Sequence, residues 1–160
     1  MRPVIRKMTL EDVPAVIELD QKSFSLPWPE RSFRFELTDN PASRCWVTEL
    51  DGRIVCMLVA WLMVDEVHIA TLATDPDFRR QGIARSLLSH VLRRLIEEGA
   101  RSSFLEVRES NLAAREMYGK FGYQQTGRRR RYYRDNDEDA ILMTLEPLRV
   151  ELLTPDTEQT

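Results

Sequence analysis

The sequence has few cysteines and no long apolar run, and both absences narrow the class of protein. Its only cysteines among 160 residues are Cys45 and Cys56. Two cysteines cannot build a disulfide framework, although a predicted turn between them leaves one pairing across a hairpin open. No apolar run is long enough to cross a bilayer, and the N-terminus has no secretory apolar segment. A charge-rich chain of this kind indicates a cytoplasmic protein with two free thiols.

An excess of positive charge is also missing. The net charge of −3 at pH 7 gives no general attraction to DNA, RNA or a membrane surface. The exception is local, because residues 128–131 are four consecutive arginines and Arg134 follows. With 42% hydrophobic residues, the chain suits one compact domain with its own core. We expect that domain at residues 1–147 and a polar C-terminal tail at residues 148–160.

The most informative stretch begins with an apolar run at residues 68–74. This run predicts a strand that ends before Pro76, because proline cannot extend a central ladder. A loop with Arg79 and Arg80 follows, and Gly82 then precedes apolar residues at helical spacing. A strand, a basic loop, a glycine and a helix together present backbone N–H groups and a positive helix end to a phosphate. Taken alone, the pattern fits an ordinary strand–helix turn with exposed arginines about equally well.

The remaining pattern predicts a mixed sheet with helices on its faces. Asp51-Gly52 between two apolar runs is a strong hairpin signal. The predicted order of elements is β-α-α-β-β-β-α-β-α-β-β. The long helix after Gly82 connects strands at residues 67–74 and 102–107, and a crossover of this kind joins parallel strands. The expected fold class is therefore α/β, in the wide sense that includes α+β.

Two polar side chains stand in otherwise apolar segments. Glu106 lies within a predicted core strand, where a carboxylate costs free energy unless it is paired or reaches a solvated cleft. A structural ion pair with Arg108, or with another arginine, is the alternative to a catalytic role. Tyr118 lies on a helix that Ser110 or Asn111 is placed to cap, and a core tyrosine with a bonded hydroxyl is the commoner explanation for Tyr118 alone. We expect these side chains to converge with the phosphate-binding pattern in the fold.

Three further patterns allow a structural and a functional interpretation. Pro27-Trp28-Pro29 is either a rigid connector with Trp28 packed on the core or a loop wall beside a substrate. His68 and the aspartates at residues 135–139 resemble metal ligands, but their settings favour no metal site. The arginines at residues 128–134 stand beside tyrosines, a combination that binds RNA by charge and stacking. A solvated strand end and a wall of a peptide channel are the other interpretations of that segment.

From about residue 3 to residue 147, the chain resembles the GNAT family of acetyl-CoA-dependent N-acetyltransferases. The family's pyrophosphate-binding motif matches Arg79-Arg-Gln-Gly-Ile-Ala84. Within the family, the chain is similar to the branch of ribosomal-protein-alanine N-acetyltransferases (the RimI type). That similarity rests on Leu105-Glu-Val-Arg108 and on Asn111-x-x-Ala114-x-x-x-Tyr118.

The resemblance implies a fold, a co-substrate and a set of site residues. The implied fold is a mixed, mostly antiparallel central sheet with a splayed parallel pair and helices on both faces. The implied co-substrate is acetyl-CoA, with no metal. Glu106 is implied as the general base, with a pKa raised by burial, and Tyr118 as the general acid for the departing thiolate. The implied acetyl-CoA contacts are Leu72, Ala73 and Thr74 at a strand interruption, Arg79, Arg80, Gln81, Gly82, Ile83 and Ala84 at the pyrophosphate, and Asn111 near the thiol.

The same resemblance implies direct acetyl transfer, in a ternary complex, to the α-amine of a ribosomal protein that begins with alanine. An α-amine has a pKa of roughly 7.7–8.0 against roughly 10.4 for lysine, so a carboxylate base deprotonates it more easily. Two alternatives stay open. One is a GNAT enzyme that acetylates a protein lysine or a small amine, and the other is a non-catalytic module that binds acetyl-CoA or RNA.

Overall fold

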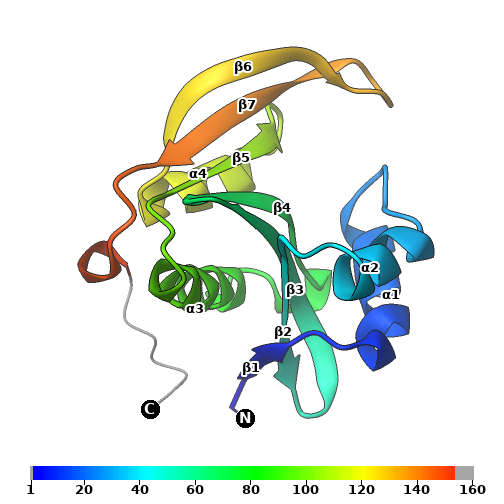
Figure 1. Ribbon diagram of the computed structural model, residues 1–160. Coiled ribbons are helices and arrows are strands. Elements are labelled where there is room, and N and C mark those ends of the chain that lie inside the picture. Colours follow the sequence, from blue (N-terminus) through cyan, green and yellow to red (C-terminus); the bar gives the residue numbers. More distant parts are fainter. Residues whose placement is uncertain (1, 154–160) are drawn as a thin grey trace.

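The computed structural model describes residues 2–153 (Figure 1). Helices and strands follow one another in the order that the sequence predicts. The strands are β1 (Val4–Lys7), β2 (Ser43–Leu50), β3 (Arg53–Met63), β4 (Glu66–Thr74), β5 (Ser102–Arg108), β6 (Gln124–Tyr133) and β7 (Glu138–Leu145). The helices are α1 (Val13–Ser23), α2 (Glu30–Thr38), α3 (Ile83–Glu97) and α4 (Leu112–Phe121), with short 3-10 turns η1 (Leu10–Asp12), η2 (Pro76–Phe78) and η3 (Val150–Leu152). No helix within residues 2–153 is both long and apolar enough to cross a membrane.

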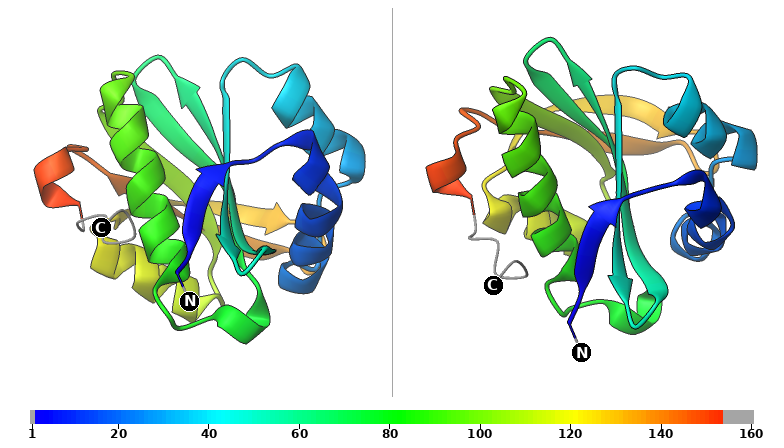
Figure 2. Two further views of the ribbon diagram at one scale, coloured as in Figure 1. Left: turned by 90° about the horizontal axis from the view of Figure 1, so that it is seen from below. Right: turned by 60° about the horizontal axis from the view of Figure 1, so that its bottom comes forward.

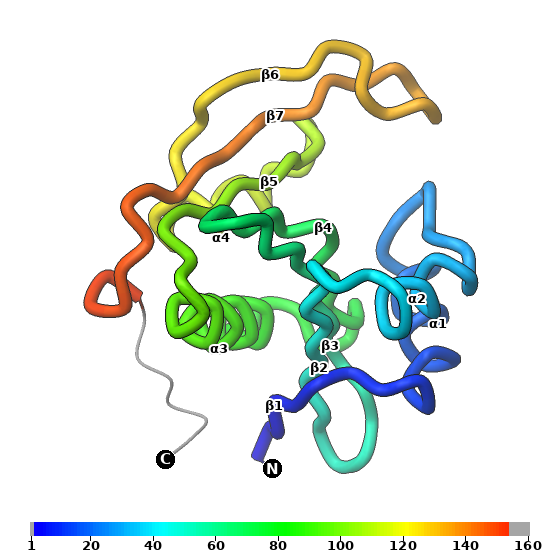
Figure 3. Tube along the Cα trace, in the orientation of Figure 1, coloured from blue at the N-terminus to red at the C-terminus, as the bar shows by residue number. Residues whose placement is uncertain are grey.

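The strands form one seven-stranded sheet in the order β1-β2-β3-β4-β5-β7-β6. Every neighbouring pair is antiparallel except β4 and β5, which are parallel, as the crossover through α3 predicts. Beyond β5, the hairpin of β6 and β7 forms one edge of the sheet and arches toward the side on which α1 and α2 lie (Figure 3). The mixed, mostly antiparallel fold is confirmed.

The parallel pair holds together only where its two strands begin. Residues 66–68 of β4 pair with residues 102–104 of β5, and the ladder ends at His68 and Phe104. Both strands continue beyond this point, so a gap opens between them in the middle of the sheet. The backbone of β4 that borders this gap is left without a strand partner on that side.

Helices cover both faces of the sheet (Figure 2). On one face, α3 and α4 pack on the larger core cluster, which includes the fully buried Leu87, Leu88 and Leu92. On the other face, α1 and α2 pack on a smaller cluster around Val16 and Phe33. These residues repeat at helical spacing, so each helix buries one apolar stripe against the sheet.

Local signals in the sequence account for several of the turns. Asp51 and Gly52 both adopt positive φ, 51° and 79°, as a tight hairpin between β2 and β3 requires. Asn111 caps α4, because its side-chain oxygen accepts a hydrogen bond from the N–H of Ala114 at 3.1 Å. Cys45 and Cys56 are buried free thiols, so the pairing across the hairpin does not form.

The prediction of a polar tail from residue 148 is wrong for its first part. Leu148 and Leu153 are buried and join the larger core cluster. The N–H of Leu148 also donates to the carbonyl of Arg101 at 2.8 Å, which fixes the chain beside β5. Burial of two leucine side chains gives this segment a hydrophobic reason to stay on the core. Residues 154–160 of the predicted tail lie outside the described residues.

Candidate active site

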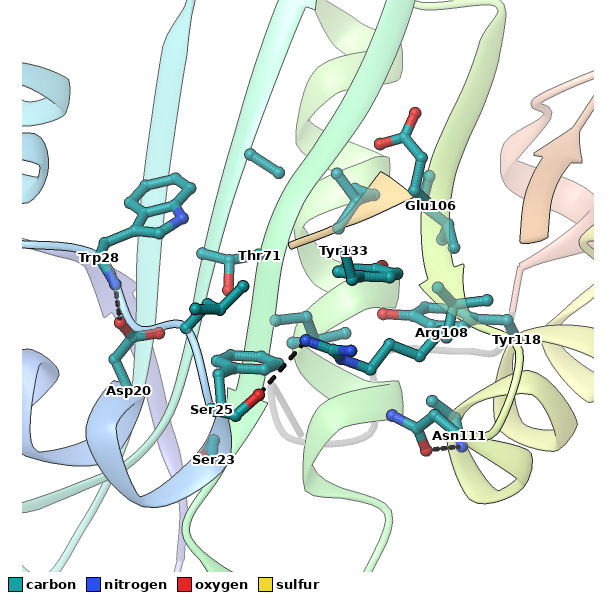
Figure 4. A pocket seen from close by; sticks show the side chains of 18 residues that line it. Asp20, Ser23, Ser25, Trp28, Thr71, Glu106, Arg108, Asn111, Tyr118 and Tyr133 are labelled. Atoms are coloured by element: carbon teal, nitrogen blue, oxygen red, sulfur yellow. Dashed lines mark hydrogen bonds between the residues drawn. The ribbon is translucent and has the colours of Figure 1, made fainter. Parts of the chain in front are cut away.

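A cavity of about 400 Å³ lies where β4 and β5 separate (Figure 4). Its walls come from the end of α1 and the loop after it, from β4 and β5, from the start of α4 and from Tyr133 of β6. Glu106, Tyr118, Asn111 and Leu72, four of the residues that the sequence predicts for the site, line it. Segments far apart in the chain thus converge on the gap in the sheet.

Glu106 enters the cavity from β5, and its side chain is 9% exposed. Its partners differ from the Arg108 that the sequence offers. Oε1 lies 2.7 Å from Nε2 of His68, and Oε2 lies 3.6 Å from Nε of Arg129. Arg108 is therefore not the ion-pair partner of Glu106, and Arg129 is the other arginine that the alternative allows.

The expectation that burial raises the pKa of Glu106 is also wrong. Burial does act in that direction and is the largest single influence. The hydrogen bond from His68, together with the charges of His68 and Arg129, outweighs it and leaves the pKa of Glu106 below its usual value. Glu106 is therefore a carboxylate at neutral pH and is ready to accept a proton.

Tyr118 reaches the cavity from α4 and is 7% exposed. Burial raises the pKa of its phenol, and the nearby Tyr123, Cys56 and Tyr133 raise it further. The phenol is therefore neutral and keeps its proton in the resting site. A neutral phenol in a dry wall can donate that proton or a hydrogen bond to an anion that forms in the cavity.

Arg108 closes one side of the cavity. Its guanidinium lies 4.0 Å from the centre of the Tyr133 ring, 2.9 Å from the carboxylate of Asp135 and 3.3 Å from the hydroxyl of Ser25. The contact with Ser25 ties β5 to the loop between α1 and α2 (Figure 4). Arg108 thus braces the walls of the cavity while Glu106 faces into it.

The interruption of β4 lies slightly earlier than the sequence predicts. Val59 pairs with Thr71 but Ala60 pairs with Ile69, so Ala70 is an extra residue in β4. This bulge falls just after the last β4–β5 pair, and residues 69–72 line the cavity. Of the predicted contacts at this strand, Leu72 lines the cavity, whereas Ala73 is buried in the smaller core and Thr74 accepts a hydrogen bond from Arg79 at its carbonyl.

The predicted phosphate-binding loop has the required backbone. Gly82 adopts a φ of +78°, and apart from Gly82 and its two chain neighbours nothing lies within 4 Å of the position that a Cβ would occupy. Ile83 starts the 15-residue helix α3 immediately after it, so the first N–H groups of the helix, at Ile83 and Ala84, have no partner within the helix. Arg80, with a φ of 63°, and Gln81 are exposed beside them. An open loop of this kind fits a diphosphate that approaches the backbone closely.

The structure also shows where Trp28, the run of arginines and the possible metal ligands lie. Trp28 satisfies both interpretations, since it packs 5.2 Å from Phe33, between ring centres, and also lines the cavity. Arg128 forms ion pairs with Glu109 and Asp139 at 2.7 and 2.8 Å, so the run of arginines is not a uniformly free basic strip. Within residues 2–153, no three His, Cys, Asp or Glu side chains gather as a metal site requires.

The sequence prediction missed two residues of the site. The sequence suggests His68 only as a metal ligand, but in the structure it stacks on Phe104 and lies within hydrogen-bonding distance of Glu106 from outside the cavity. Its place in the predicted parallel strand, opposite the Glu106 strand, was the available signal. Asp20 is 1% exposed and lines the cavity. It continues the inward stripe of Val13 and Val16 at helical spacing, which was the signal for a buried carboxylate.

The splayed parallel strands, the bulge and the open loop before α3 define a fold with room for an extended acyl-CoA at the gap of its sheet. The chain belongs to the acetyltransferase (GNAT) family, whose model matches residues 13–123. It is thus an N-acetyltransferase that uses acetyl-CoA, and the implied pyrophosphate site fits the residues present.

Relatives within the family agree with the branch that the sequence indicates. The ribosomal protein bS18-alanine N-acetyltransferase of Escherichia coli (strain K12) is 33% identical over 152 residues, covering 88% of this chain and 95% of that protein. A protein of Bacillus subtilis (strain 168), provisionally given the same name, is 38% identical over 142 residues and covers 89% of this chain and 94% of that protein. The crystal structure of the ribosomal-protein-S18-alanine N-acetyltransferase from Escherichia coli superposes with a TM-score of 0.83 at 32% identity, over 91% of this chain and 94% of that chain.

Proposed function

We propose that this enzyme acetylates the α-amine of a ribosomal protein that begins with alanine. The observation that carries the proposal is the position of Glu106 and Tyr118 on the walls of one cavity at the gap between β4 and β5. The relatives named for the alanine of bS18 support the choice of substrate. The proposed setting is the cytoplasm, where both cysteines stay free thiols.

Acetyl-CoA supplies the acetyl group as an activated thioester. In the proposed site, the loop at residues 79–84 binds the diphosphate, and the unpaired edge of β4 at residues 69–74 offers backbone groups to the extended arm, like an added strand. The side-chain oxygen of Asn111 is engaged in capping α4, so its amide nitrogen is the group left to face the cavity. These contacts fix the position of the thioester between the two strands.

Glu106 and Tyr118 then divide the proton transfers. Glu106, ionised at neutral pH, takes the proton of the α-ammonium directly or through water. Tyr118, neutral because burial raises its pKa, gives a proton to the thiolate that leaves. The pKa of an α-amine, roughly 8, lies much closer to that of a carboxylate than the pKa of lysine, roughly 10.4, which favours a protein N-terminus as substrate.

The test is thiol release from acetyl-CoA with two short peptides. One begins with a free alanine, and the other has a blocked N-terminus and an internal lysine. We expect turnover only with the free alanine. Turnover with the blocked peptide identifies a lysine acetyltransferase instead. If neither peptide releases thiol although acetyl-CoA binds, the substrate proposal is contradicted.

A further inference from the structure

Asp20 is a second carboxylate in the cavity, and only one of its two oxygens has a hydrogen-bond partner. It comes from α1, on the opposite wall from Glu106 (Figure 4). Oδ2 accepts a hydrogen bond from the N–H of Trp28 at 2.7 Å. Oδ1 is buried and has no hydrogen-bond partner among residues 2–153. A buried carboxylate oxygen without a donor costs free energy, so its presence calls for a ligand that supplies one.

The surroundings of Asp20 indicate the charge and the donors that such a ligand should have. No cationic side chain of the described residues pairs with Asp20, and burial raises its pKa, partly offset by the bond from Trp28. The cavity walls combine apolar side chains, such as Phe24, Leu26 and Leu72, with uncharged hydroxyls. A negative charge in such a setting is stabilised best by a small positive group with several N–H donors.

The other carboxylate of the cavity is already engaged. Both oxygens of Glu106 lie near a basic side chain, Oε1 beside His68 and Oε2 beside Arg129. Glu106 thus serves as a proton acceptor whose charge is balanced by the protein itself. Of the two carboxylates, Asp20 is the one with an oxygen that pairs with no group of residues 2–153.

We propose that Asp20 binds the α-ammonium group of the incoming peptide through Oδ1 and orients it for Glu106, a role that rests on the proposed N-terminal substrate. The ammonium is the form that predominates at neutral pH, so Asp20 acts on the substrate as it arrives. The amine keeps an N–H that donates to Oδ1 after Glu106 has taken one proton. The contact therefore stabilises the bound peptide and the transition state alike, and it acts on KM and not on kcat. A lysine side chain that enters from elsewhere does not require this contact.

The experiment compares two peptides that differ only at the amine. One begins with alanine, and the other begins with a propionyl group, which keeps the shape and removes the α-amine. Binding of both is measured by calorimetry in the presence of CoA, for the wild type and for Asp20→Asn. Asparagine keeps an acceptor for the N–H of Trp28 but removes the charge. The matched control is Glu18→Gln. Glu18 is an exposed carboxylate on the same helix and pairs with Lys22.

We expect the wild type and Glu18→Gln to prefer the alanine peptide by roughly tenfold, the effect of one charge-assisted hydrogen bond, and Asp20→Asn to lose the preference. In turnover, Asp20→Asn raises KM for the peptide by a similar factor and leaves kcat and KM for acetyl-CoA near the wild-type values. Equal weakening of both peptides, which a role in positioning Trp28 would produce, overturns the proposal, as does a preference that survives in Asp20→Asn.

A second variant covers the case in which Asp20→Asn does not fold. Glu106→Gln keeps Asp20, so it should retain the preference for the alanine peptide although its turnover falls. Loss of the preference in Glu106→Gln would assign the ammonium to Glu106 and overturn the proposal. Failure of the substrate assignment is recognised separately, because the wild type would then not acetylate the alanine peptide at all.

Discussion

Glu106 Oε1 and His68 Nε2 lie 2.7 Å apart, one on each of the parallel strands, at the point where those strands separate. His68 does not line the cavity, whereas Glu106 does. His68 is also held by ring contacts with Phe104 at 4.5 Å and Trp61 at 5.2 Å between ring centres. A rigid partner outside the cavity thus fixes both the orientation and the charge of the proposed base.

Replacement of Glu106 tests that base directly. Glu106→Gln keeps the shape of the side chain but cannot accept the proton, so kcat should fall by roughly 10²–10⁴-fold, the range for removal of a general base. Affinity for acetyl-CoA, measured by calorimetry, should stay near that of the wild type. A marked loss of that affinity would show that Glu106 has a structural role in the gap of the sheet.

Replacement of His68 should move the pH profile without abolishing activity. The bond and charge of His68 lower the pKa of Glu106 against the effect of burial, so His68→Ala should raise that pKa. Glu106 must be ionised to act, and the acidic limb of the profile of kcat/KM should therefore shift to higher pH. Phe104→Leu removes the ring stacked on His68 and keeps the bond to Glu106, so it serves as the control. An unshifted limb in His68→Ala would contradict this role.

Removal of the hydroxyl of Tyr118 should affect catalysis, whereas removal of the hydroxyl of Tyr123 should affect stability. Tyr118→Phe removes the proton donor in the cavity and should lower kcat by about 10²-fold or more with little change in thermal stability. Tyr123→Phe is the matched control, since its hydroxyl bonds with Ser103 at 2.7 Å in the buried interior. That variant should lose about 1 kcal/mol of unfolding free energy and keep kcat. The reverse pattern would remove Tyr118 from the mechanism.

The backbone at Gly82 should matter for acetyl-CoA. Apart from its two chain neighbours, the Cβ added in Gly82→Ala meets nothing within 4 Å, so its effect comes only from the φ of +78°. An alanine there costs about 1–2 kcal/mol, and relief of that strain would displace the N–H groups at the start of α3. KM for acetyl-CoA should therefore rise several-fold while KM for the peptide stays unchanged. Gly119→Ala, inside α4 and equally uncrowded, should leave both KM values unchanged. A normal KM for acetyl-CoA in Gly82→Ala would place the diphosphate elsewhere.

Much of the fold follows from signals that act over a few residues. The hairpin at Asp51-Gly52, the cap at Asn111 and the start of α3 after Gly82 depend on local φ preferences and on nearby donors. The position of Glu106 in an apolar strand was likewise visible, because a carboxylate in a core strand needs an explanation. These features therefore could be predicted from the sequence, and so could the class of enzyme.

The sequence by itself determined which elements form and which residues belong to the motif. Only the tertiary structure decided the partners and charge states in the site. The pKa of Glu106 depends on His68 and Arg129, which lie 38 residues before and 23 residues after it in the chain. The unpaired oxygen of Asp20 and the packing of Leu148 on the core likewise depend on distant segments. Electrostatic and packing energies fall off with distance in space and not along the chain, so they are fixed only once the sheet has brought those segments together.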